Sequence, residues 1–82
     1  MAKSFQVGIY STDQIFYEGE TVSLIVPSVS GYLGILADHA PLVAKLSSGK
    51  ITIHTLRGDT RVIDSPLGGF LQVLQNQAIL LL

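Results

Sequence analysis

The chain has 82 residues, which is enough for one small domain. Five Lys and Arg residues against six Asp and Glu residues give a net charge of −1, so the basic surface that nucleic-acid binding requires is missing. Cys is absent, which excludes disulfides and Cys-based metal sites. Charged residues make up 13% of the chain, against about 25% in ordinary soluble domains, whereas 48% are hydrophobic. We expect part of this apolar surface to remain outside the core, where permanent partner proteins would cover it.

The hydrophobic residues do not form a membrane-spanning run. The longest wholly apolar run, Ala78–Leu82, has five residues, whereas a spanning helix needs about 20. The first residues, Met1-Ala2-Lys3-Ser4, lead directly into an alternating pattern and contain no apolar signal-peptide core. We therefore expect a chain without a leader that stays in the cytoplasm.

Strands are the predicted elements along most of the chain. Val, Ile and Thr make up nearly a quarter of the residues, a composition that favours strands. Polar and apolar residues alternate with the period of two that is typical of half-buried strands. The alternation covers Phe5–Ile9, Thr21–Val26 and Ile51–Leu56, and more loosely Phe70–Leu82, which we divide into two strands around Gln75-Asn76-Gln77. Thr60–Asp64 is predicted as the hairpin partner of Ile51–Leu56.

Turn-forming residues separate these runs. They lie at Ser11–Asp13, Glu18–Gly19, Ser28–Gly31, Ser47–Gly49, Arg57–Asp59 and Pro66–Gly69. Short strands at this spacing predict one all-β domain over residues 1–82, an antiparallel sandwich or barrel. The tripeptide Arg57-Gly58-Asp59 matches a cell-adhesion motif, but we interpret it as the tip of a hairpin in which Gly58 supplies the turn.

The stretch from Asp38 to Gly49 is ambiguous. Asp38 could cap a helix that Pro41 opens and Gly49 closes, with Leu42 and Leu46 four residues apart on one face. Local signals therefore favour a short helix and an extended segment equally.

No catalytic, cofactor-binding or metal-binding residues are predicted. Asp38 and His39 are adjacent, so their side chains point to opposite faces of an extended segment and cannot form a dyad. We expect His39 to be structural or interfacial and His54 to be a solvated strand residue. The glycines do not match a phosphate-binding loop, and the acidic residues are scattered without metal-ligand spacing.

The segment from Val26 to Leu46 combines a polar loop tip, Ser28-Val29-Ser30, with a string of apolar residues that is too long for one small core to bury. The string consists of Leu33, Ile35, Leu36, Ala40, Pro41, Leu42, Val43, Ala44 and Leu46. Large apolar patches on small proteins mark interaction sites. The segment therefore predicts a protein interface.

The same segment carries a family signature. Gly31–Leu42 reads GYLGILADHAPL, which closely resembles the G-x-[LIM]-G-[IV]-L-x-x-H-A-P-L signature of the epsilon subunit of F-type ATP synthases. Further matches cover nearly the whole chain in order, at Phe5–Ser11, Glu20–Pro27, Ser48–Ile53, Gly68–Val73 and Ala78–Leu82. The resemblance implies a flattened sandwich of two antiparallel sheets, with Asp38–Leu46 as a turn leading into a strand rather than a helix.

The resemblance also implies a non-catalytic subunit of the central stalk, which binds the gamma subunit and the membrane rotor ring and couples ion flow to ATP synthesis. The residues implied to face gamma are Ser11, His39, Ala40, Pro41, Leu42, Val43 and Ala44. Those implied to face the ring loops are Ser28, Val29, Ser30, Gly31 and Tyr32. The implied location is peripheral, on the cytoplasmic face of the bacterial inner membrane, with membrane contact only through the complex and no homo-oligomer.

Two departures from the family pattern matter. Many relatives have an acidic residue where Tyr32 stands, so charge pairing with the ring is replaced here by an aromatic side chain that can anchor by burial. Typical members continue into a C-terminal two-helix hairpin that regulates ATP hydrolysis, and we expect residues 1–82 to lack that regulation. The alternative is a small β-sandwich adaptor or ligand-binding module outside ATP synthase.

Overall fold

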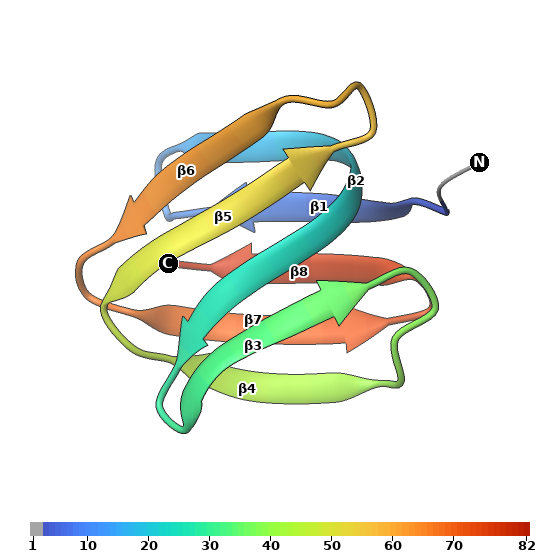
Figure 1. Cartoon of the computed structure of the whole chain (residues 1–82). Coiled ribbons are helices and arrows are strands. Elements are labelled where there is room, and N and C mark those ends of the chain that lie inside the picture. Colours follow the sequence, from blue (N-terminus) through green and yellow to red (C-terminus); the bar gives the residue numbers. More distant parts are fainter. Residues whose placement is uncertain (1–2) are drawn as a thin grey trace.

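The structure is a computed structural model that describes residues 3–82. The predicted absence of a leader and the predicted N-terminal limit of the domain depend partly on Met1 and Ala2, which lie outside the described residues. Residues 3–82 contain no helix (Figure 1). The strands are β1 (Phe5–Tyr10), β2 (Ile15–Ser28), β3 (Gly31–Leu36), β4 (Leu42–Leu46), β5 (Gly49–Thr55), β6 (Thr60–Ser65), β7 (Gly69–Leu74) and β8 (Gln77–Leu81).

The strands form two layers, as Figure 1 shows. One layer has the order β4-β7-β8-β1 and ends on the first half of β2, whose residues 15–21 pair with β1. The other has the order β3-β2-β5-β6 and uses the second half of β2. The predicted all-β sandwich is therefore confirmed. One pairing departs from the antiparallel pattern, because β1 and β8 run parallel.

Strand β2 belongs to both layers because it bends between them. Its 14 residues pair first with β1 and then with β3 and β5, and the register with β5 shifts between Thr21 and Ser23. A bulge of this kind bends a strand and increases its twist. The turn predicted at Glu18–Gly19 is wrong, because Gly19 lies opposite Val7 inside this long strand.

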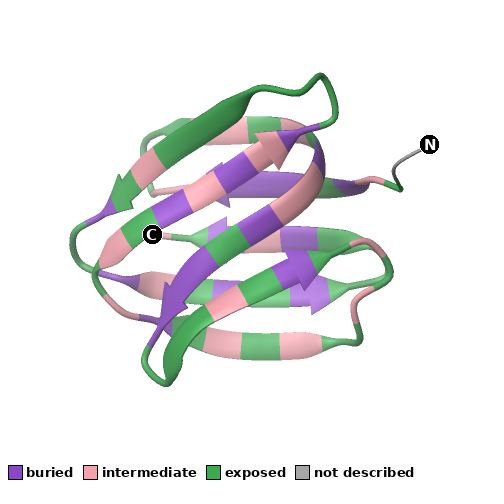
Figure 2. Cartoon of the chain, in the orientation of Figure 1, coloured by how far each residue is buried: buried purple, intermediate pink, exposed green. Residues whose placement is uncertain are grey.

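The core lies between the two layers. Alternate residues of the strands point inward, and Figure 2 shows the resulting sequence of buried and exposed positions along each strand. The buried hydrophobic residues form one cluster, which consists of Phe5, Val7, Ile9, Leu24, Val26, Ile35, Leu46, Ile51, Ile53, Leu71, Val73, Ala78 and Leu80. Burial of such side chains is the main stabilising contribution to a fold of this size.

Most of the predicted turns are confirmed, and the ambiguous segment becomes a strand. The chain runs through a turn after β3 and enters β4 at Leu42, as the family resemblance implied and the helix interpretation did not. The Arg57–Asp59 hairpin is present, with Gly58 at a φ of 98°. Gly34 lies within β3 opposite Ile25.

Candidate functional site

Strand β4 lies at the edge of the first layer and presents Val43 and Lys45 to solvent. Val43 is 74% exposed, whereas Leu42 and Ala44 are half-buried and pack against the core. This alternation follows from the strand period of two. Among the three neighbours predicted to face gamma, Val43 alone points its side chain fully outward.

Val43 belongs to a larger apolar surface, which we call the apolar outer face. Phe70 and Leu81 lie opposite each other on β7 and β8 and are 57% and 55% exposed. Val43 lies opposite Gln72, which in turn lies opposite Ile79, so one row of side chains crosses β4, β7 and β8. The members of the face are Val43, Phe70, Leu74, Ile79 and Leu81. A shallow hollow lies among Val43, Phe70, Gln72, Ile79 and Leu81.

The part of this face that β7 and β8 contribute was not predicted from the sequence. The alternation in Phe70–Leu82 predicted the strands but not which parity points outward. Pairing of β7 with both β4 and β8 decides this, because Leu71 and Val73 are the residues that reach the core. The opposite parity, which includes Phe70 and Leu74, is left exposed.

The loop between β3 and β4 carries His39, Ala40 and Pro41 at one end of the first layer. Asp38 takes the left-handed conformation with a φ of 62°, and the amide N–H of His39 donates to the Leu36 carbonyl over 3.3 Å. The Nδ1–H of His39 donates to the carbonyl of Ala40 over 2.8 Å. Ala40 and Pro41 are exposed, and His39 is half-buried. These three residues adjoin the apolar outer face where β4 begins.

Ser11 lies at the opposite end of the same layer. It follows β1, and its Oγ–H donates to Asp13 Oδ1 over 3.1 Å within the β1–β2 turn. The six residues of β1 separate this turn from the end where the His39 loop lies, a distance of about 20 Å at the usual rise per residue. A partner that contacts both Ser11 and His39 must therefore extend along the full length of the strands.

The hairpin between β2 and β3 places Ser28, Val29, Ser30 and Gly31 together at its tip. The Ser28 hydroxyl donates to the Gly31 carbonyl and accepts from the Ser30 amide over 3.2 Å. Gly31 has a φ of 117°, a conformation that other residues rarely adopt. Val29 is 64% exposed, so the rigid tip presents an apolar side chain to solvent.

Backbone hydrogen bonds tie this tip to the end of β4. The Val29 amide donates to the Lys45 carbonyl over 3.1 Å, and the Ser47 amide donates to the Pro27 carbonyl over 2.8 Å. Ser28 and Leu46 also pair as neighbouring strand residues. The hairpin tip and the strand that carries Val43 are thus one connected unit.

Tyr32 lies on the outer side of the second layer, just after the tip. It is 65% exposed and pairs with Pro27, and its hydroxyl lies beside Gly49. Nearby, Lys50 forms an exposed ion pair with Asp64 at 2.8 Å, and the hydrogen bond and then the charge of Asp64 raise the pKa of Lys50. Exposed pairs of this kind contribute little to stability.

Among residues 3–82 there is no cluster of three His, Asp or Glu side chains placed to hold a metal ion. His54 Nδ1 lies 3.1 Å from the Thr60 hydroxyl in an exposed contact between β5 and β6. In the same range of residues, no helix is long and apolar enough for a membrane crossing.

Comparison with known proteins identifies the family. The model of the "ATP synthase, Delta/Epsilon chain, beta-sandwich domain" family matches residues 4–82. The chain belongs to this family. It is 38% identical over 79 residues to the ATP synthase epsilon chain of Chlorobium limicola, an alignment that covers 96% of this chain and 89% of that protein. The epsilon chain of Leptospira interrogans is 40% identical over 80 residues, which cover 98% of this chain and 61% of the relative.

The epsilon-type fold is also seen in solved structures. One chain of the mitochondrial ATP synthase of Euglena gracilis superposes with a TM-score of 0.87 at 18% identity, over 95% of this chain and 49% of that chain. A chain of the Tetrahymena thermophila central stalk and c-ring structure gives 0.77 at 13% identity, over 98% and 63% of the two chains. The epsilon chain of Dichelobacter nodosus is 38% identical over 99% of this chain, which spans 56% of that relative's length.

Proposed function

We propose that this chain is the β-sandwich part of a central-stalk rotor subunit of an F-type ATP synthase, a single domain over residues 1–82. In this role it catalyses no reaction and holds no cofactor or metal. It binds the gamma subunit and the membrane rotor ring, and the turning of the ring by ion flow is passed to gamma for ATP synthesis. The observation that carries the proposal is the family match over residues 4–82.

The gamma contact is assigned to the first layer. The apolar outer face supplies its centre with Val43, the His39-Ala40-Pro41 loop borders one end, and Ser11 borders the other. Permanent interfaces are large and relatively apolar at their centre. Leu42 and Ala44 contribute through their exposed part and by fixing the orientation of Val43, because their side chains pack on the core.

The ring contact is assigned to the β2–β3 hairpin. Its residues are Ser28, Val29, Ser30, Gly31 and Tyr32. Val29 and Tyr32 provide exposed apolar and aromatic surface, and Tyr32 takes the place of the acidic residue common in relatives. The protein then lies peripherally at the cytoplasmic face of the bacterial inner membrane and reaches the membrane only through the complex, without forming a homo-oligomer.

Strand β4 supports the coupling role because it links the two proposed contacts. Val43 is the second of the five residues of this strand. At the end of the strand, the Lys45 carbonyl accepts from the Val29 amide and Leu46 pairs with Ser28, and these contacts hold the hairpin tip. Force applied at the tip therefore reaches the gamma contact through a hydrogen-bonded, close-packed sheet rather than through a flexible linker.

Copurification tests the proposal against the alternative of an adaptor outside ATP synthase. The tagged 82-residue chain is added to gamma and, separately, to detergent-solubilised rotor ring from the same organism. Retention of both proteins through gel filtration is the expected result. Retention of neither would refute the rotor assignment and leave the adaptor alternative.

A further inference from the structure

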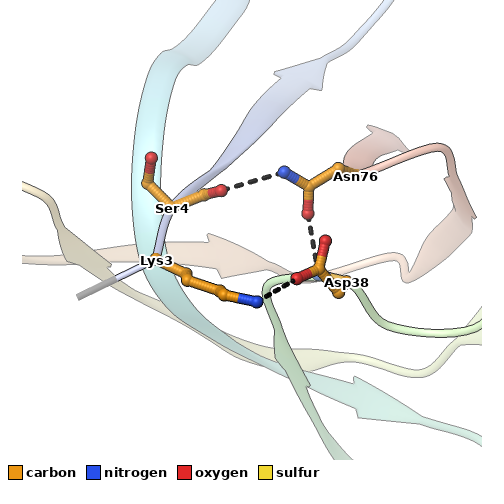
Figure 3. Close-up of polar contacts among 4 residues, drawn as sticks. All are labelled: Lys3, Ser4, Asp38 and Asn76. Atoms are coloured by element: carbon orange, nitrogen blue, oxygen red, sulfur yellow. Dashed lines mark hydrogen bonds and ion pairs between the residues drawn. The ribbon is translucent and has the colours of Figure 1, made fainter. Parts of the chain in front are cut away.

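Three chain segments that are distant in sequence meet at the end of the first layer where the His39 loop lies. They are residues 3–4 before β1, the β3–β4 loop at Asp38, and the β7–β8 turn at Asn76 (Figure 3). Asn76 bonds to both other segments through its side-chain amide. Its Nδ2 donates to the Ser4 carbonyl over 2.9 Å, and its Oδ1 accepts from the Asp38 amide over 2.8 Å.

The backbone of Asn76 is also held in place. Its carbonyl accepts from the Gln6 amide over 3.3 Å, and it has a left-handed φ of 61°. Asn adopts this conformation more readily than most residues do. The side-chain amide is thereby fixed between the start of β1 and the β3–β4 loop, and both of its ends are used.

The contact with Asn76 stabilises the backbone conformation of Asp38. Asp38 also has a left-handed conformation, which costs free energy for a residue with a Cβ unless neighbouring contacts hold it. The bond from its amide to Asn76 Oδ1 is such a contact, and Lys3 Nζ adds an exposed ion pair at 3.0 Å. On the other side of the loop, Pro41 restricts Ala40 to extended conformations. The segment between them is therefore fixed at both ends.

We infer that Asn76 is a positioning residue for the His39-Ala40-Pro41 loop, which it preorganises for the gamma subunit. The inference rests on the proposed function, because it assigns a role in the gamma contact to a residue that need not touch gamma. Preorganisation raises affinity by removing the cost of ordering a loop during binding. The side-chain amide of Asn76, in the β7–β8 turn, thus fixes the conformation of the β3–β4 loop and of the surface that this loop contributes.

The test replaces Asn76 by Gly, which tolerates the left-handed backbone but lacks the amide. Gln75→Gly is the matched control, because Gln75 precedes it in the same turn with a φ of 52° and lies outside the Asp38–Ser4 bonding network. The measurements are amide hydrogen exchange at Asp38 by NMR and gamma affinity by surface plasmon resonance, both on the full chain.

Asn76→Gly is expected to speed exchange at Asp38 and to weaken gamma binding, each by about 3- to 10-fold, because an exposed hydrogen bond has a modest net value. Gln75→Gly is expected to change neither. Unchanged exchange in Asn76→Gly would overturn the structural link, and faster exchange with unchanged gamma affinity would overturn the positioning role. If the unaltered chain itself fails to bind gamma, the proposed function fails, while the exchange measurement still decides the link between Asn76 and Asp38.

Discussion

Replacement of Val43 by Asp separates binding from folding on strand β4. The side chain is 74% exposed in the free chain, so its substitution removes little buried surface. Surface substitutions change the free energy of unfolding by up to about 0.5 kcal/mol, and the lower strand propensity of Asp adds at most about 1 kcal/mol. We therefore expect the variant to fold normally, as measured by circular dichroism and urea unfolding.

The same substitution is expected to abolish the gamma complex. Valine loses about 1–2 kcal/mol of burial that the interface would have provided. A carboxylate buried without a partner costs about 3–5 kcal/mol more. The sum, about 4 kcal/mol or more, lowers affinity at least about a thousandfold. Isothermal titration of gamma into the folded variant measures this loss.

Val62→Asp is the matched control for this experiment. Val62 is 55% exposed on β6 and lies opposite Thr52 in the second layer, away from the apolar outer face. The variant is expected to bind gamma as the unaltered chain does. Undiminished binding by Val43→Asp, or an equal loss in Val62→Asp, would refute the assignment of gamma to the first layer.

Other predictions concern the hairpin, a tight turn and one phenol. Ser28→Ala removes both side-chain bonds at the hairpin tip and is expected to weaken ring retention in copurification while gamma retention persists. Gly68→Ala is expected to lower the free energy of unfolding, measured by urea titration, by about 2 kcal/mol or more. The reason is that Gly68 has a φ of 75° and that a Cβ there would lie 2.3 Å from the carbonyl oxygen of Leu46, the last residue of β4. Gly34→Ala is the control and is expected to have a much smaller effect, because the space beside Gly34 is open. The hydrogen bond that Tyr10 donates to Glu18 raises the pKa of the Tyr10 phenol above its ordinary value of 10.0. The stabilisation of the fold by this bond is therefore present below about pH 10 and is lost as the pH rises through the raised pKa. In an absorbance titration, Tyr10→Phe is expected to lack the ionisation of this phenol.

The strands could be predicted from the sequence because their cause is local. Alternation in Phe5–Ile9 and Ile51–Leu56 reflects one face turned to the core, and the turn residues between strands have their own backbone preferences. Gly19 shows the limit of such local signals. Glycine is typical of turns, yet Gly19 lies within β2 because it pairs with Val7 of β1.

The candidate site depends more on contacts between distant segments. Val43 was predicted from the family resemblance, but Phe70 and Leu81 become part of the same face only through pairings across β4, β7 and β8. Asn76 was predicted as a turn residue, and nothing local indicates that its amide reaches Asp38, 38 residues away. Long-range register of this kind leaves no periodic trace in the sequence.

The register of β4 against β7 determines which residues of β4 pack on the core and which are available to a partner. A slip by one residue against β7 would turn Val43 toward the core and bring Leu42 and Ala44 to the surface. That slip is opposed at both ends: by the bonds between the hairpin tip and the end of β4, and by the fixed loop before Leu42. The turns at the two ends of this short strand therefore do more than connect elements, because they select which residues the proposed partner meets.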